Sequence, residues 1–240
     1  MYTFEFLEYN DLTKEIMSEK TTLENVIDIG LNGKPSKEEK KYLNSVEDWA
    51  KYAFEKDEIY FITVNQNNKP FASIRFTDMH ITIDFLEEYG NELIKTLTLV
   101  YHRFDLLEYL RNDKKKFYTN NNLFLGEITS YGFIDGNRKS ITNIVFGTND
   151  FATITLTEFY PELQDWKTAE QNIKVNTSNN FIRSPKHYKD FEYLLDYQNN
   201  IKSEYFDLPF VSDSNLSEQD SSKILKNKDK FWLPPDWNKN

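Results

Sequence analysis

The chain has 240 residues, of which 39% are hydrophobic and 16% aromatic, and its formal net charge is −10. This aromatic content is sufficient for a packed core and argues against a disordered chain. Cysteine is absent, which excludes disulfides, thiol catalysis and thiolate metal sites.

The sequence also lacks the usual signals for export. Its start has no basic segment followed by an apolar core, and no apolar run approaches the roughly 18 residues of a membrane-spanning helix. We therefore expect a cytoplasmic protein that contacts no membrane. Its negative charge is spread over both halves. An acidic surface repels the phosphates of nucleic acids and favours binding to a basic protein partner.

The first part of the chain predicts one strand and two helices. Residues 2–9 alternate between apolar and polar in the manner of a strand, and apolar spacing within 11–31 indicates a helix. Ser36 is followed three residues later by Glu39, the pattern of a capping box. We expect a second helix to begin there and to continue to Phe54.

The clearest pattern predicts an antiparallel meander. Residues 59–64 and 71–77 are rich in β-branched and aromatic residues, and the polar residues between them favour a hairpin turn. Alternation over 79–85 adds a third strand, which Gly90 ends. Residues 92–111 carry both helical spacing and a strand-like run, and we expect a helix.

The second half repeats this outline after a polar, lysine-rich loop at 112–122. Three further strands are predicted at 123–133, 140–146 and 151–159, with turn residues between them. Their resemblance to the first meander indicates either an ancient duplication or a shared strand composition. The strand residues expected on buried faces are Phe76, Ile81, Ile83, Phe85, Ile144, Phe146, Ile154 and Leu156.

The C-terminal part predicts two more helices and a tail. A proline at a first helical position indicates a helix over 161–173, and another is expected over 184–198. The polar residues 212–230 are expected to be mobile, whereas Trp232 and Trp237 are expected to pack on the folded body.

Together these elements predict an α+β fold in which antiparallel β-meanders pack with helices that cover one face. The meanders form either one continuous sheet or two similar halves, 1–111 and 123–211, and the segment 212–240 follows them.

Motifs of known chemistry are missing from the sequence. Neither GxGxxG, GxxxxGK[ST] nor GxSxG occurs, so no cofactor and no catalytic residue is predicted. His80, His102 and His187 are too far apart in sequence for a local metal-ligand motif, so no metal is predicted. His80 shares a strand face with Asp84, which would suit acid–base chemistry, but an exposed histidine near a carboxylate is the simpler interpretation.

Acidic residues near strand ends are the candidate partner-binding residues: Asp84, Glu87 and Glu88 in the first half, and Glu158 and Glu162 in the second. We expect a non-enzymatic binding protein, specifically a stoichiometric inhibitor or immunity protein of a basic toxin or nuclease. The alternatives are an enzyme of unfamiliar type using carboxylates near Asp84 and Glu88, and a structural or phage-derived assembly protein. The partner and the oligomeric state stay open.

Overall fold

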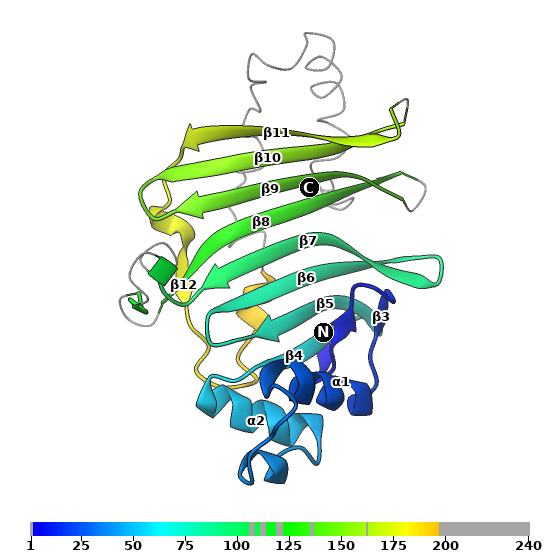
Figure 1. Cartoon of the computed structure of the whole chain (residues 1–240), viewed down its shortest axis with the longest axis vertical. Helices are drawn as coiled ribbons and strands as arrows, with labels where there is room; N and C mark the ends of the chain where they lie inside the picture. The colour runs from blue at the N-terminus through cyan, green and yellow to red at the C-terminus, as the bar shows by residue number, and fades with distance from the viewer. Residues whose placement is uncertain are drawn as a thin grey trace.

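A computed structural model describes residues 2–105, 109–110, 114–118, 122–134, 137–161 and 163–196. Nearly half of these residues belong to one large antiparallel sheet (Figure 1). Its strands follow the order β1-β4-β5-β6-β7-β8-β9-β10-β11, and β12 pairs with β8 outside this path. From β4 to β11 the sheet is therefore a simple meander.

The strands of the large sheet are β1 (Tyr2–Glu5), β4 (Tyr60–Gln66), β5 (Lys69–Phe76), β6 (His80–Tyr89), β7 (Glu92–His102), β8 (Asn122–Ile134), β9 (Asn137–Gly147), β10 (Phe151–Tyr160), β11 (Asp165–Lys174) and β12 (Phe181–Arg183). A separate hairpin consists of β2 (Tyr9–Asn10) and β3 (Glu15–Ile16). Among the described residues, the helical elements with both ends described are α1 (Glu19–Asn25), the π-helix η1 (Val26–Gly30), α2 (Val46–Lys56) and the 3-10 turns η2 (Glu39–Lys41), η4 (Ser178–Asn180) and η5 (Glu192–Leu195).

Turn residues marked in the sequence make the tight meander feasible. Asn67 and Asn68, between β4 and β5, have positive φ values of 54° and 62°. Gly90, between β6 and β7, has a φ of 63°. Asparagine and glycine tolerate this left-handed backbone conformation, which two-residue hairpin turns require. The hairpin predicted between residues 59–64 and 71–77 is therefore confirmed, whereas the hairpin that Gly90 makes between β6 and β7 was not predicted.

One face of the sheet is apolar from β4 to β10. Directly paired residues on successive strands form a continuous buried row: Ile62, Ile74, Ile83, Leu99, Ile128, Ile144 and Ile154. All eight strand residues predicted to lie on buried faces are buried. The period-two alternation in the sequence therefore correctly identified the core-facing side chains.

The opposite face is polar. Its central row of paired residues consists of Thr63, Ser73, Asp84, Thr98, Thr129, Asn143 and Thr155. This row crosses the same strands as the apolar row, one residue away along each strand. The two faces of the sheet thus present opposite chemistry.

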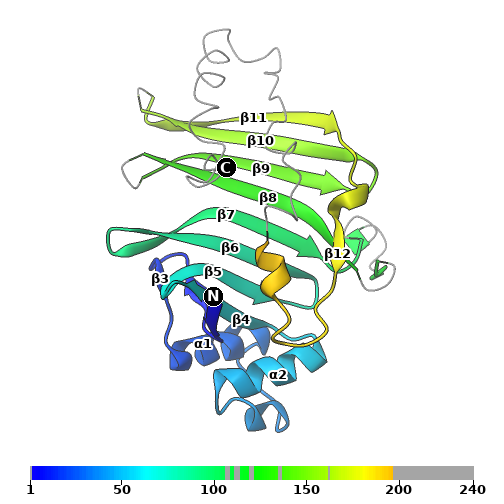
Figure 2. The same cartoon turned by 180° about the vertical axis from the view of Figure 1, so that it is seen from behind.

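The two faces are covered by different segments. On the apolar face lies η5 (Figure 2), whose Leu194 and Leu195 are buried in the core together with the preceding Phe191. The Phe191 ring packs edge-on against Phe4 of β1, with centroids 5.1 Å apart. On the polar face lies the β2–β3 hairpin (Figure 1).

Helices contribute less to this fold than expected. Both α1 and α2 lie together at the β4 edge of the sheet (Figure 1), where the Trp49 Nε1 donates a hydrogen bond of 2.8 Å to the Ile59 carbonyl. The antiparallel meander is confirmed. The molecule is nevertheless mostly sheet, and α1 and α2 do not form a layer over one face.

The capping box at Ser36 forms but does not start the long helix predicted from it. The Ser36 amide donates to the Glu39 carboxylate at 2.5 Å, and the Glu39 amide donates to the Ser36 hydroxyl at 3.2 Å. Only the 3-10 turn η2 follows. The helix α2 has its own N-cap, Ser45, whose hydroxyl accepts a hydrogen bond from the Asp48 amide.

Two predicted helices are strands. The helix expected over 92–111 is wrong for its first half, because β7 pairs along its length with β6 and from Leu97 onwards with β8. It buries Leu97, Leu99 and Tyr101 on one face. The helix expected over 161–173 is wrong because β11 pairs with all of β10. In both segments, pairing with neighbouring strands overrides a spacing that also fits a helix.

The third overturned helix is the one predicted over 184–198. Within its described part only η5 is helical, and it is a single 3-10 turn. In the middle of the chain, β7 pairs with β8, so the sheet is continuous between strands from both sides of 112–122. The segment 212–240, with Trp232 and Trp237, lies outside the described residues.

Candidate functional site

A cavity of about 680 Å³ lies on the polar face, between the β2–β3 hairpin and strands β5 to β8. A volume of this size is typical of ligand-binding sites. Besides two tyrosines, its ionisable lining residues are four acids, Glu8, Asp11, Asp84 and Glu127, two bases, Arg75 and Lys95, and the histidines His80 and His102. We refer to it as the acidic cavity.

The hairpin wall of the acidic cavity is attached to β7 by three contacts. The Tyr9 hydroxyl donates a hydrogen bond of 2.7 Å to the Leu93 carbonyl, and the Leu93 amide donates one of 2.9 Å to the Lys14 carbonyl. The Lys95 ammonium lies 3.3 Å from the Asp11 carboxylate. These contacts fix the hairpin over the sheet and create a recess between them.

Asp84 lies at the floor of the acidic cavity. Its carboxylate accepts a hydrogen bond of 2.5 Å from the Thr98 hydroxyl and lies 3.8 Å from the Lys95 ammonium. Burial raises the pKa of Asp84, and the nearby Lys95 charge and the Thr98 hydrogen bond offset this only in part. The contacts of Asp84, together with the charge of Arg75, therefore do not fully compensate for its burial.

The other acids of the cavity are held by polar neighbours. The Asn25 side-chain amide at the end of α1 donates a hydrogen bond of 2.9 Å to Glu8, whose pKa is raised by burial. On the opposite wall, Glu127 accepts hydrogen bonds from the Asn143 amide at 2.6 Å and from the Thr129 hydroxyl at 3.0 Å. The carboxylates are thus positioned by the fold.

The two histidines are directly opposite each other on β6 and β7, with ring centroids 6.4 Å apart. Burial lowers the pKa of His80 to about 4, aided by the charge of Arg75, and burial also lowers the pKa of His102. His80 is therefore neutral at pH 7 and adds no positive charge. Its closest ring neighbour is His102, which sequence reasoning did not pair with it.

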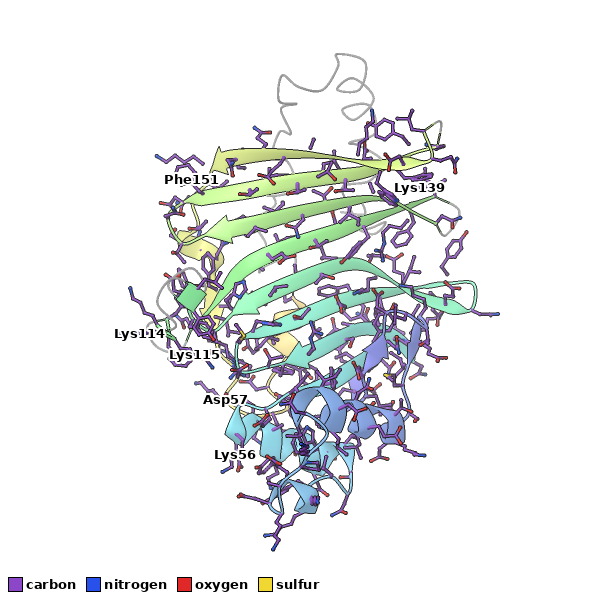
Figure 3. The ribbon with its side chains drawn as sticks, viewed as in Figure 1. Lys56, Asp57, Lys114, Lys115, Lys139 and Phe151 are labelled. Atoms are coloured by element: carbon purple, nitrogen blue, oxygen red, sulfur yellow. The ribbon has the colours of Figure 1, made fainter. Side chains whose placement is uncertain are left out.

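A second cavity, of about 270 Å³, lies beside the first and is mostly apolar. We refer to it as the apolar cavity. Tyr118, Phe124, Val145 and Phe151 line it, and His102 lines both cavities. Phe151 begins β10 at one end of the strands, opposite the end that carries Lys139 (Figure 3).

The predicted partner-binding residues do not form one patch. Asp84 lies in the acidic cavity, but Glu87 and Glu88 line a different cavity of about 430 Å³ near the β4–β5 turn. Glu88 forms an ion pair with Lys69. Glu158 lies on β10, where burial raises its pKa to about 7. Glu162 lies outside the described residues.

Sequence reasoning missed the acids that surround Asp84. Glu127 and Thr129 are two residues apart on β8, so their side chains lie on the same face of the strand. This spacing could have placed Glu127 on the polar face. Nothing in the pattern indicates that Asp11 folds back over β7. Within the described residues, no group of three or more histidine and acidic side chains could hold a metal ion, and no helix is long and apolar enough to cross a membrane.

Comparison of the chain with protein-family models, with curated proteins and with solved structures finds no match. The geometry and electrostatics of the two cavities are therefore the features from which a function can be inferred.

Proposed function

We propose that this protein binds a basic protein partner through the acidic cavity, and that it acts as a stoichiometric inhibitor in the manner of an immunity protein against a toxin or nuclease. The observation that supports this most is the excess of carboxylates over cations in the cavity. A recess with this balance favours a lysine or arginine side chain of a partner.

The state of Asp84 strengthens the argument. A buried carboxylate is costly unless it is paired, and the Lys95 ammonium lies 3.8 Å from it, near the outer limit for an ion pair. Lys95 also lies closer, at 3.3 Å, to Asp11. A cation from a partner would add to the attraction that Lys95 and Arg75 already provide, so complex formation would offset more of the cost of burying Asp84.

The net charge of −10 supports the same proposal at longer range. An acidic protein attracts a basic partner before contact, which speeds association and makes it sensitive to salt. In a complex, the carboxylates would also occupy the basic surface with which a nuclease holds nucleic acid.

The test uses the product of the gene adjacent to this one in its genome. We expect binding with a dissociation constant that rises with salt, and protection of cells that express that product. Asp84→Asn should weaken binding roughly tenfold, the effect of one charge-assisted contact. Asp28→Asn, a change at an exposed acid of η1 outside the acidic cavity, is the matched control.

Equal binding by wild type and Asp84→Asn would contradict the proposed site. Absence of binding and protection, together with turnover of a small substrate by the purified chain, would favour the enzymatic alternative.

A further inference from the structure

The acidic and apolar cavities share a wall. His102 lines both, and Glu127 of the acidic cavity is the direct cross-strand partner of Val145, which lines the apolar cavity. Directly paired side chains on antiparallel strands have Cβ atoms about 5 Å apart. The two cavities are therefore neighbouring parts of one surface on the polar face.

The dividing wall is built by a local feature of β8. The β7–β8 register shifts between Val100 and Tyr101, which leaves Gly126 between the paired residues Leu125 and Glu127. A Cβ atom at Gly126 would lie 2.1 Å from Cδ2 of the His102 ring. Because glycine has no Cβ, the imidazole can lie against the β8 backbone and separate the two cavities.

The apolar cavity has the features of an anchor site. Phe151 and Val145 are 50% and 46% exposed, which is high for apolar side chains that line a recess. Its charged lining residue, Asp105, is acidic, as in the neighbouring cavity. A partner residue buried here would be apolar, and the surrounding charge would still favour a basic segment.

We infer that the two cavities together recognise an extended segment of a basic protein in which an arginine or lysine and an aromatic or large aliphatic residue are two positions apart. This inference rests on the proposed function and specifies the partner's chemistry. In an extended chain, side chains i and i+2 point the same way about 6.5–7 Å apart, a spacing that suits neighbouring cavities. The basic side chain reaches Glu127, and the apolar one packs beside Val145, the cross-strand partner of Glu127, and against Phe151 and Tyr118.

The experiment titrates the isotope-labelled full chain with three capped tripeptides and follows its amide signals by NMR. The first is acetyl-Arg-Ala-Phe-amide, the second has serine in place of phenylalanine, and the third has glutamate in place of arginine. We expect the first to bind most tightly and each replacement to weaken binding roughly tenfold, as expected for losing one partly buried anchor or one charge pair. Signals from both cavities should shift.

Variants separate the two cavities. Phe151→Ser should remove the preference for phenylalanine over serine, and Glu127→Gln the preference for arginine over glutamate. Phe117→Ser is the matched control, because Phe117 is 60% exposed and lines neither cavity. Gly126→Ala should displace the His102 ring and weaken binding of the first peptide without changing the charge of the protein.

Equal affinity for the three peptides, absence of binding to all of them, or the same loss in Phe117→Ser as in Phe151→Ser would overturn the inference. The proposed function can survive that result. If the adjacent gene product binds wild type and Phe151→Ser equally well and weakens only with Asp84→Asn, the acidic cavity still acts as a binding site and the two-cavity segment is wrong.

Discussion

At the scale of single residues, the acidic cavity contains ionisable groups whose pKa values are shifted by burial. Asp84 has a raised pKa and His80 a lowered one, so each is pushed towards its neutral form. Such groups cost stability in the free protein and are retained where they serve binding or chemistry. For this reason we propose Asp84 and its neighbours, rather than Glu87 and Glu88, as the binding site.

The lowered pKa of His80 has a consequence for stability. In the unfolded chain a histidine titrates near 6.5, whereas in the folded protein the pKa of His80 is about 4. Between these values the unfolded state binds more protons, so the free energy of unfolding should fall as the pH falls from about 6.5 to 4. His80→Asn should flatten this dependence, measured by denaturant unfolding at pH 4, 5, 6 and 7. An unchanged slope in the variant would show that another group dominates.

Sequence patterns predicted the positions of some site residues and not of others, for physical reasons. Alternation along β6 places Asp84 and His80 on the polar face because strand side chains alternate with a period of two. The pairing of His102 with His80 follows only after β7 is known to be a strand. Asp11 reaches the site because a short hairpin folds back over β7, and no local pattern encodes that long-range contact.

At the scale of elements, β7 and β11 show why periodicity alone misled the prediction. Along β7 the apolar residues satisfy a helical spacing as well as a strand, and the deciding contribution is pairing with β6 and β8, which the segment itself does not display. β11 is mostly exposed, so its alternation is weak, and its pairing with β10 determines its conformation. The meander strands with strong alternation could be predicted from their own residues, without knowledge of their pairing partners.

The β2–β3 hairpin is the element that turns a flat polar face into a cavity, and its attachment can be tested. Tyr9→Phe removes the hydrogen bond to the Leu93 carbonyl and keeps the ring. We expect the free energy of local opening, in which the hairpin detaches from β7, to fall by about 0.5–1.5 kcal/mol. Amide exchange at Leu93, whose N–H bonds to the Lys14 carbonyl, should accelerate. The amide of Ile83, at the centre of β6, is the internal reference and should exchange as in wild type.

Acceleration at both amides in Tyr9→Phe would instead show that the hairpin unfolds only together with the sheet. Unchanged exchange at both would show that the ion pair between Lys95 and Asp11 and the backbone bond suffice to hold it.

At the scale of the whole molecule, one sheet carries both meanders. The buried row runs without interruption from Ile62 on β4 to Ile154 on β10, and the buried cluster includes residues from β4 to β10 and from η5. A duplication in the sequence is compatible with this arrangement, because two copies of a meander can join edge to edge through β7 and β8. The physical question is whether the two parts unfold together.

We expect a single cooperative transition. Separating the parts between β7 and β8 would break a ladder that pairs Leu97 to His102 with β8 and would expose the buried row at Leu99 and Ile128. Each part alone would then present an unpaired central strand to water, which favours unfolding of both at once. The measurement follows the methyl signals of Ile62 and Ile154 by NMR across a denaturant series. Coincident midpoints and slopes are expected for the two methyl groups. A shift of one midpoint by more than the error of the fit would instead establish two units that fold separately and meet at the β7–β8 ladder.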